Sequence, residues 1–237
     1  MSNELLREAA AIWDDPNESM ESVEARIHDG VPKEKLTERA DSYVNVAFNL
    51  FPYIQFPTNG VVLEIGSGLG YIMEALHRAL LAHSTPPQTI LGLDIAKNMI
   101  AKAEKRLQKK PPFCFLHYDG VNIPLPDQSI DLIFSVAALQ HIPKPYVYNL
   151  FFEIKRLLKP LGFVVFQIFS FQSFVLQEMN QEKWYKEIKH QITGGKTHWH
   201  YFYAREELEI VLRHGTGFSS VDVRDGGGSY WTCAHSH

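Results

Sequence analysis

The stretch from residue 61 to 70, VVLEIGSGLG, constrains the fold of this chain more than any other. Its first five residues form a mostly apolar, β-branched run, which is typical of a strand buried on both faces. Three glycines follow at alternate positions, Gly66, Gly68 and Gly70. From Tyr71 onward the apolar residues recur with helical spacing. A strand, a glycine turn and a helix bring bare backbone N–H groups to a ligand, so the stretch predicts a binding site.

Alternating strand and helix patterns continue to about residue 169. The expected strands cover residues 90–95, 113–118, 130–136 and 162–168, and the expected helices cover 97–109 and 146–158. Repeated units of this kind imply a parallel sheet with helices on both faces and a ligand beyond the carboxyl ends of its strands. A helix over 204–213 and two closing strands, 218–223 and 230–234, complete the pattern. We therefore expect a Rossmann-like, doubly wound α/β sheet of seven strands, mostly parallel with an antiparallel last strand.

Two segments lie outside this pattern. Residues 1–58 are expected to form an N-terminal helical cap, with helices over 3–13 and 19–28 and a longer one after Pro32. The apolar stripe of the longer helix fits either packing against the core or a lid over a cleft, and periodicity does not separate the two. Within the main domain, 59–237, residues 170–203 carry eight aromatics and a possible hinge at 194–195, and they are expected to form a substrate-side insertion.

Composition narrows the functional classes. The 237 residues are 45% hydrophobic and 21% charged, as in ordinary globular proteins. Apolar runs are too short to span a membrane, and no secretory signal is visible at the start, so a cytoplasmic monomer or homodimer is expected. Residues 1–60 hold 11 acids and 5 bases, and the net charge is −4, so no nucleic-acid partner is expected. Cys114 and Cys233 are interpreted as buried thiols.

The glycine spacing separates two nucleotide-binding families. A dinucleotide fold requires G-x-G-x-x-G, but the position of the third glycine is Tyr71, and the acid Glu64 precedes the turn. Residues 62–70 instead resemble the first motif of the class I S-adenosylmethionine-dependent methyltransferases, of the small-molecule, type 11-like kind. Further features of that family follow in order: Asp94, Asp119-Gly120, the loop 123–133, residues 135–137, and the turn 157–162, where Leu161 replaces a glycine.

The resemblance implies S-adenosyl-L-methionine as the cofactor. In this family an acid in the place of Asp94 holds the ribose hydroxyls, and a carboxylate can accept from both hydroxyls of a diol. Asp119 would face the adenine amino group and Glu64 the methionine end. The alternatives are a helix cap for Asp94 and a helix-dipole acid for Glu64. The full implied cofactor set is Glu64, Gly66, Ser67, Gly68, Gly70, Asp94, Ile95, Asp119, Gly120, Val121, Ser135 and Val136.

Three histidines are candidates for the acceptor side. His141 follows the fourth strand where the cleft should open, and many small-molecule members of the family have a histidine there. An imidazole can remove a hydroxyl proton near neutral pH, although it can equally hydrogen-bond the loop. In an extended segment His198 and His200 point to the same side and would line the substrate pocket. No companion acid has metal-ligand spacing, so no metal is expected.

The leading hypothesis is a metal-independent transfer of a methyl group to a small molecule at a hydroxyl oxygen, with His141 as candidate base. The loop after the fourth strand, residues 135–138, lacks the N-P-P-Y pattern of enzymes that methylate base or glutamine amino groups, and no Pro-Cys nucleophile is present. Three alternatives stay open: C- or N-methylation of a small or carrier-bound metabolite, a methyltransferase-fold partner without catalysis, and, as the weakest, an NAD-dependent oxidoreductase.

Overall fold

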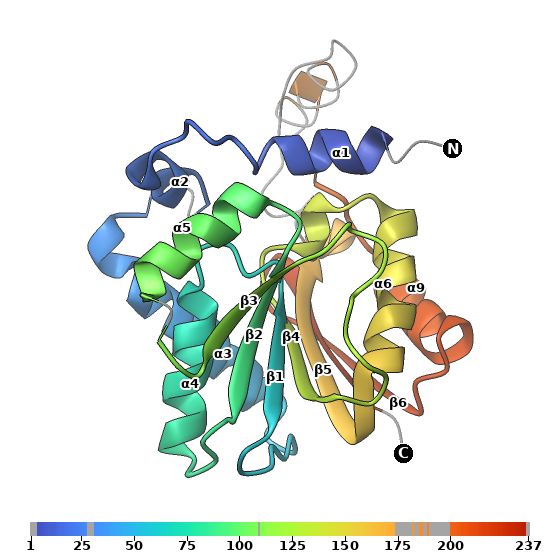
Figure 1. Cartoon of the computed structure of the whole chain (residues 1–237). Coiled ribbons are helices and arrows are strands. Elements are labelled where there is room, and N and C mark those ends of the chain that lie inside the picture. The colour runs from blue at the N-terminus through green and yellow to red at the C-terminus, as the bar shows by residue number, and fades with distance from the viewer. Residues whose placement is uncertain are drawn as a thin grey trace.

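The computed structural model describes residues 4–27, 31–108, 110–173, 182, 185–186, 189 and 200–235. Its centre is a seven-stranded sheet with the order β3-β2-β1-β4-β5-β7-β6 (Figure 1). The last strand, β7, runs antiparallel to both of its neighbours, and the other pairings are parallel. The expected Rossmann-like sheet is thereby confirmed. The strands are β1 (Val61–Ile65), β2 (Thr89–Asp94), β3 (Phe113–His117), β4 (Ile130–Ser135), β5 (Leu158–Phe169), β6 (Ser220–Asp225) and β7 (Ser229–His235).

Helices cover the sheet on both faces. On one side lie α3 (Leu36–Leu50), α4 (Tyr71–Ala82) and α5 (Lys97–Leu107), and on the other side lie α6 (Lys144–Leu157) and α9 (Arg205–Ile210) (Figure 1). Strand side chains alternate between the two apolar clusters: Val62 belongs to the cluster with α3 and α4, and its neighbour Leu63 to the cluster with α6 and α9. Burial on both faces explains why the central strands have continuous apolar runs.

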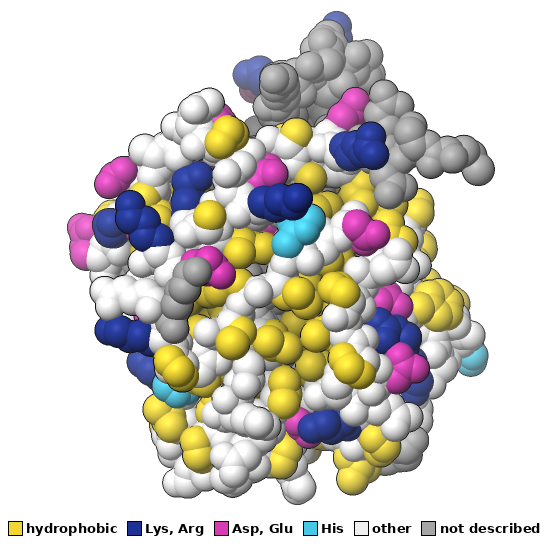
Figure 2. Space-filling model, viewed as in Figure 1, with side chains coloured by type: hydrophobic (Ala, Val, Ile, Leu, Met, Phe, Trp, Pro, Cys, Tyr) yellow, Lys and Arg dark blue, Asp and Glu magenta, His cyan; other side chains and the backbone are white. Residues whose placement is uncertain are grey.

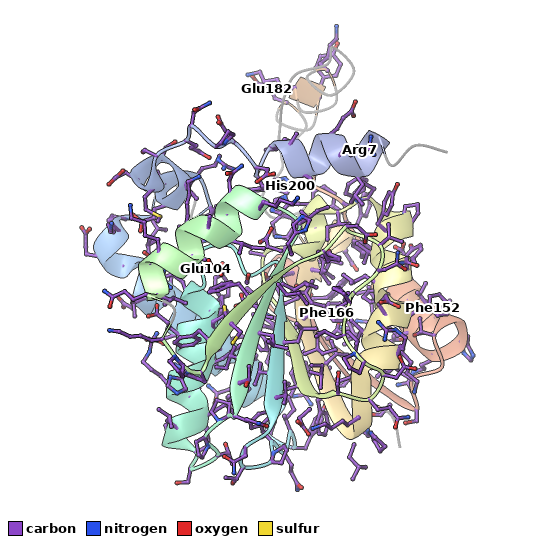
Figure 3. All side chains as sticks on the ribbon, in the orientation of Figure 1. Arg7, Glu104, Phe152, Phe166, Glu182 and His200 are labelled. Carbon is purple, nitrogen blue, oxygen red and sulfur yellow. The ribbon has the colours of Figure 1, made fainter. Side chains whose placement is uncertain are left out.

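The connection from β3 to β4, residues 118–129, contains no helix. The sheet on this side is covered by a loop, and hydrophobic side chains gather at the centre of the face in Figure 2. Leu116 at the end of β3 and Leu125 in the loop are partly buried against the core cluster. Deeper inside, the ring of Phe166 on β5 packs 5.3 Å from that of Phe151 on α6 (Figure 3).

The N-terminal segment crosses the carboxyl ends of the strands (Figure 1). It contains α1 (Glu4–Ala11), α2 (Met20–Ile27) and a 3₁₀ turn, Lys33–Lys35, before α3. The side chain of Leu6 is 4% exposed, and α1 packs it onto Gly120. The long helix packs Val44 and Ala47 into the core, while its Arg39 and Tyr43 line a cavity. Packing against the core is thus observed, and a lid function of this helix stays a prediction.

Several predicted boundaries shift. The helix expected over 97–109 ends at Leu107, since Gln108 is left-handed with φ +53°. The longer N-terminal helix begins at Leu36, after the 3₁₀ turn. Strand β5 starts at Leu158, four residues before the expected position, and it contains Leu161 at φ +66°. The expected hinge at 194–195 and His198 lie outside the described residues. No described helix is long and apolar enough to cross a bilayer.

Candidate cofactor and acceptor site

A cavity of about 620 Å³ lies at the carboxyl ends of the central strands. Its walls come from the glycine turn after β1, the end of β2 and the loop after β4, together with α2, α3 and the end of β5. These segments are far apart in sequence, and the parallel sheet brings them to one edge. The cavity therefore occupies the position that the strand order predicts for a ligand.

The glycine turn needs its glycines for two reasons. Gly66, Gly68 and Gly70 have φ angles of +74°, +51° and +80°, a backbone conformation that residues with a Cβ rarely adopt. A Cβ on Gly66 would lie 2.3 Å from the Cβ of Ala138, whereas a Cβ on Gly68 would meet nothing within 4 Å. Gly66 thus permits close packing of the loops after β1 and β4, and Gly68 leaves the backbone open to the cavity.

Asp94 ends β2 and is held in place by the backbone. Its Oδ2 accepts a hydrogen bond from the Gly68 N–H at 2.9 Å, and its Oδ1 accepts one from the Ala96 N–H at 2.9 Å. The residue is 9% exposed and lines the cavity. Burial raises the pKa of Asp94, and the two N–H groups oppose that shift. Each carboxylate oxygen can accept a further bond, so capping and ligand binding are compatible.

Glu64 on β1 is the deepest acid of the cavity. Its side chain is 1% exposed, and Oε2 has no hydrogen-bond partner among the described residues. Burial, and next the negative charge of Asp94, raise the pKa of Glu64 well above its usual value, while the Met73 N–H and Arg106 act in the opposite direction. A buried carboxylate with an unsatisfied oxygen favours a cation. Glu64 therefore fits a positively charged group of a cofactor, whereas Asp94, whose oxygens each accept one backbone hydrogen bond, can accept further bonds from ligand donors.

Aromatic and imidazole rings form the acceptor side. His141 lies on a 3₁₀ turn, Leu139–His141, after β4, and its ring centroid is 4.9 Å from that of His200. Figure 3 shows His200 at the carboxyl end of the sheet, below α1. Trp13 packs edge-on against His141 at 5.3 Å, and Phe169 packs against His200 at 5.1 Å. All four rings line the cavity, so the structure brings His141 and His200 together in one wall.

The structure brings part of the predicted set to the cavity. The residues that line it are Glu64, Gly66, Ser67, Gly68, Asp94, Ile95, Val136, His141 and His200. Those outside its lining are Gly70, Asp119, Gly120, Val121 and Ser135. Ser135 is buried and donates to the Ile65 carbonyl at 2.8 Å. Asp119 is exposed and accepts from the Val121 and Asn122 N–H groups, which lower its pKa. Cofactor contacts by these five residues stay predictions.

Sequence reasoning allowed the N-terminal segment to cover a cleft but named none of its residues as site residues. Trp13, Arg26, Arg39 and Tyr43 all line the cavity. The segment is anchored near the cofactor end, because Asp14 Oδ1 accepts from the Asn98 N–H at 2.7 Å at the start of α5. One signal that could have pointed to this wall of the cavity is Arg26, which lies on a helix expected over 19–28. Nothing in the sequence pattern predicts which residues Arg26 contacts.

Within the described residues, no group of three or more His, Cys, Asp or Glu could hold a metal ion.

The strand order and the position of the cavity are those of a Rossmann-like fold that binds its ligand at the carboxyl ends of the strands. Residues 63–166 match the family model Methyltransf_11, described as a methyltransferase domain. This part of the chain is therefore a methyltransferase domain of the class that uses S-adenosylmethionine, and the family and cofactor predictions are confirmed at that level.

Individual relatives share parts of the chain. It is 30% identical over 141 residues to a malonyl-[acyl-carrier protein] O-methyltransferase of Marinomonas sp. (strain MWYL1), covering 58% of this chain and 50% of that protein. It is 35% identical over 107 residues to a trans-aconitate 2-methyltransferase of Escherichia coli O1:K1 / APEC, covering 45% of this chain and 38% of that protein. These matches span half or less of either relative. Among solved structures, the DhpI–SAH complex aligns with a TM-score of 0.64 at 18% identity, covering 100% of this chain and 98% of that one, which shows the shared fold.

Proposed function

We propose that this chain transfers a methyl group from S-adenosylmethionine to an oxygen atom of a small or carrier-bound acceptor, with His141 as the base. The observation that carries the proposal is that His141 lines the same cavity as Glu64 and Asp94. One cavity thus has an acidic end suited to the cofactor and an imidazole end suited to a nucleophile. The relative named as an O-methyltransferase of a malonyl carrier protein supports an oxygen acceptor.

The residues of the cofactor end would bind and orient. Asp94 would accept hydrogen bonds from the ribose hydroxyls, and Glu64 would face the ammonium group with its unsatisfied oxygen. When bound, S-adenosylmethionine supplies a methyl group on a positively charged sulfur with a neutral thioether as leaving group. The protein needs mainly to align the acceptor and to exclude water from the cavity.

His141 would take the proton from an acceptor hydroxyl. Its ring lies between those of Trp13 and His200, which restrict its orientation. General-base catalysis typically contributes about 10²- to 10⁴-fold in rate. A base is required for a hydroxyl acceptor, whereas an acceptor that is already deprotonated requires only alignment. A carbon acceptor with an acidic C–H also needs a base, whereas a neutral amine attacks without one. The effect of removing His141 therefore separates N-methylation from transfer to a hydroxyl oxygen.

The test is methyl transfer from labelled cofactor to a panel of hydroxylated and carboxylated small molecules. We expect His141→Ala to lower kcat by about 10²-fold or more. Its affinity for S-adenosylhomocysteine should change less than about twofold, because the imidazole lies on the acceptor side. His83→Ala on the far end of α4 is the matched control. Full rate in His141→Ala would refute the base role and would favour N-methylation or an acceptor oxygen that is already deprotonated. A purified protein that does not bind the cofactor would refute the methyltransferase function.

A further inference from the structure

Arg26 on α2 is a cation that is built into the acceptor side of the cavity. Its Nε donates to Glu18 Oε1 at 3.0 Å, and its Nη2 bonds the other oxygen of the same carboxylate. The Ser22 hydroxyl donates to Glu18 as well, at 2.9 Å. These bonds fix the plane of the guanidinium. The third nitrogen, Nη1, is buried and has no hydrogen-bond partner among the described residues.

The position of Arg26 follows from its ring contacts. The guanidinium carbon lies 4.6 Å from the ring centroid of Trp13, and Trp13 packs against His141. Arg26, Trp13 and His141 all line the cavity. The arginine is therefore connected through one indole to the proposed base.

A buried guanidinium nitrogen without an acceptor is costly, and an anion is the ligand that satisfies it best. A planar, fixed guanidinium matches the geometry of a carboxylate in particular. The acids of the cavity, Glu64 and Asp94, are expected to repel an anion from the cofactor end. An anionic group of the acceptor would thus be drawn toward Arg26.

We infer that Arg26 holds a carboxylate group of the methyl acceptor, so that the acceptor class is a carboxylic acid. This inference rests on the proposed function and deepens it. The ion pair with Glu18 keeps two nitrogens of the guanidinium occupied and leaves Nη1 for the acceptor. Arg26 is a specificity-determining residue in this assignment, and the cofactor does not depend on it.

The experiment measures ligand binding to protein loaded with S-adenosylhomocysteine. The probes are malonate, trans-aconitate and benzoate at millimolar concentrations, each beside the ester in which all of its carboxyl groups are methylated, which is the neutral counterpart. We expect at least one carboxylate to raise the melting temperature of the wild-type protein more than its ester does. Arg26→Gln should weaken that binding about tenfold or more, as expected for the loss of a charge-assisted hydrogen bond, with S-adenosylhomocysteine affinity retained.

Glu18→Gln is the matched control, because it removes the partner of Arg26 and keeps the cation. Carboxylate binding should be equal or tighter in this variant, whereas a purely structural role of the ion pair would weaken it as much as Arg26→Gln does. Equal binding of esters and acids, or equal carboxylate binding by wild type and Arg26→Gln, would overturn the inference. Loss of S-adenosylhomocysteine affinity in Arg26→Gln would assign the arginine to the cofactor and also overturn it. If the wild-type protein binds no S-adenosylhomocysteine, the proposed function is refuted as well.

Discussion

Replacing Asp94 by alanine tests the cofactor end of the cavity directly. The carboxylate accepts the Gly68 and Ala96 N–H groups at 2.9 Å each, which fixes its orientation and leaves one further lone pair on each oxygen. A charge-assisted hydrogen bond is worth roughly 1.5–3 kcal/mol. Because about 1.4 kcal/mol corresponds to a factor of ten, Asp94→Ala should weaken cofactor binding by about ten- to a hundredfold.

Calorimetric titration with S-adenosylhomocysteine measures the effect. Asp94→Asn is the informative second variant, since its amide offers one acceptor oxygen where the backbone requires two. One of the Gly68 and Ala96 N–H groups then loses its partner, so Asn should restore little of the affinity. Asp127→Ala, at an exposed carboxylate paired with Arg156, is the control and should bind normally. A folded Asp94→Ala protein with wild-type affinity would refute the role of Asp94 at the ribose.

Two other predictions concern stability. The pKa of Glu64 is raised in the folded protein without cofactor, so the folded protein keeps a proton on this carboxyl group that the unfolded chain releases. The stability of the protein should therefore fall as the pH rises from about 4.5 through the raised pKa of Glu64. In Glu64→Gln that loss should disappear, and the melting temperature of the variant should exceed that of the wild type by a margin that grows with pH; a constant margin would contradict this. Leu161 is exposed and has a left-handed backbone. Leu161→Gly should raise the free energy of unfolding by about 1 kcal/mol and the Tm by roughly 2–4 °C, whereas Leu161→Ala keeps a Cβ and should raise neither.

The central strands were predictable because burial on both faces leaves a strong mark on the sequence. Strand β1 and the start of α4 fall at the positions expected from the apolar run and the glycines. The start of β5 was not, since residues 157–162 match a turn of the family in which Leu161 takes the place of a glycine. In the structure Leu161 is left-handed as such a position requires, but it lies inside the strand. The pairing of β4 with β5 shifts register between Ile130 and Leu132, next to this turn, and such local geometry depends on the neighbouring strand.

The two ends of the site differ in how far the sequence could reach. Glu64 and Gly68 lie within one motif, and Asp94 ends the next strand, so their convergence follows from the parallel sheet alone. Trp13 comes from the turn after α1 and Arg26 comes from α2, and the placement of both depends on tertiary packing. Periodicity gives the face of a helix but not the element on which it docks. The acceptor end was accordingly left to His141 and the aromatic segment.

The start of α5 shows how the two ends are joined. Ala96, at the N-cap position of this 11-residue helix, has no side chain that could cap it. Two carboxylates from other segments cap the helix instead: Asp94 accepts a hydrogen bond from the Ala96 N–H, and Asp14 accepts one from the Asn98 N–H. Exposed helix N–H groups attract negative charge, so α5 fixes both Asp94 and the segment that carries Trp13. Because Trp13 contacts His141, the same helix end orients two walls of one cavity, the wall with Asp94 and the wall with His141.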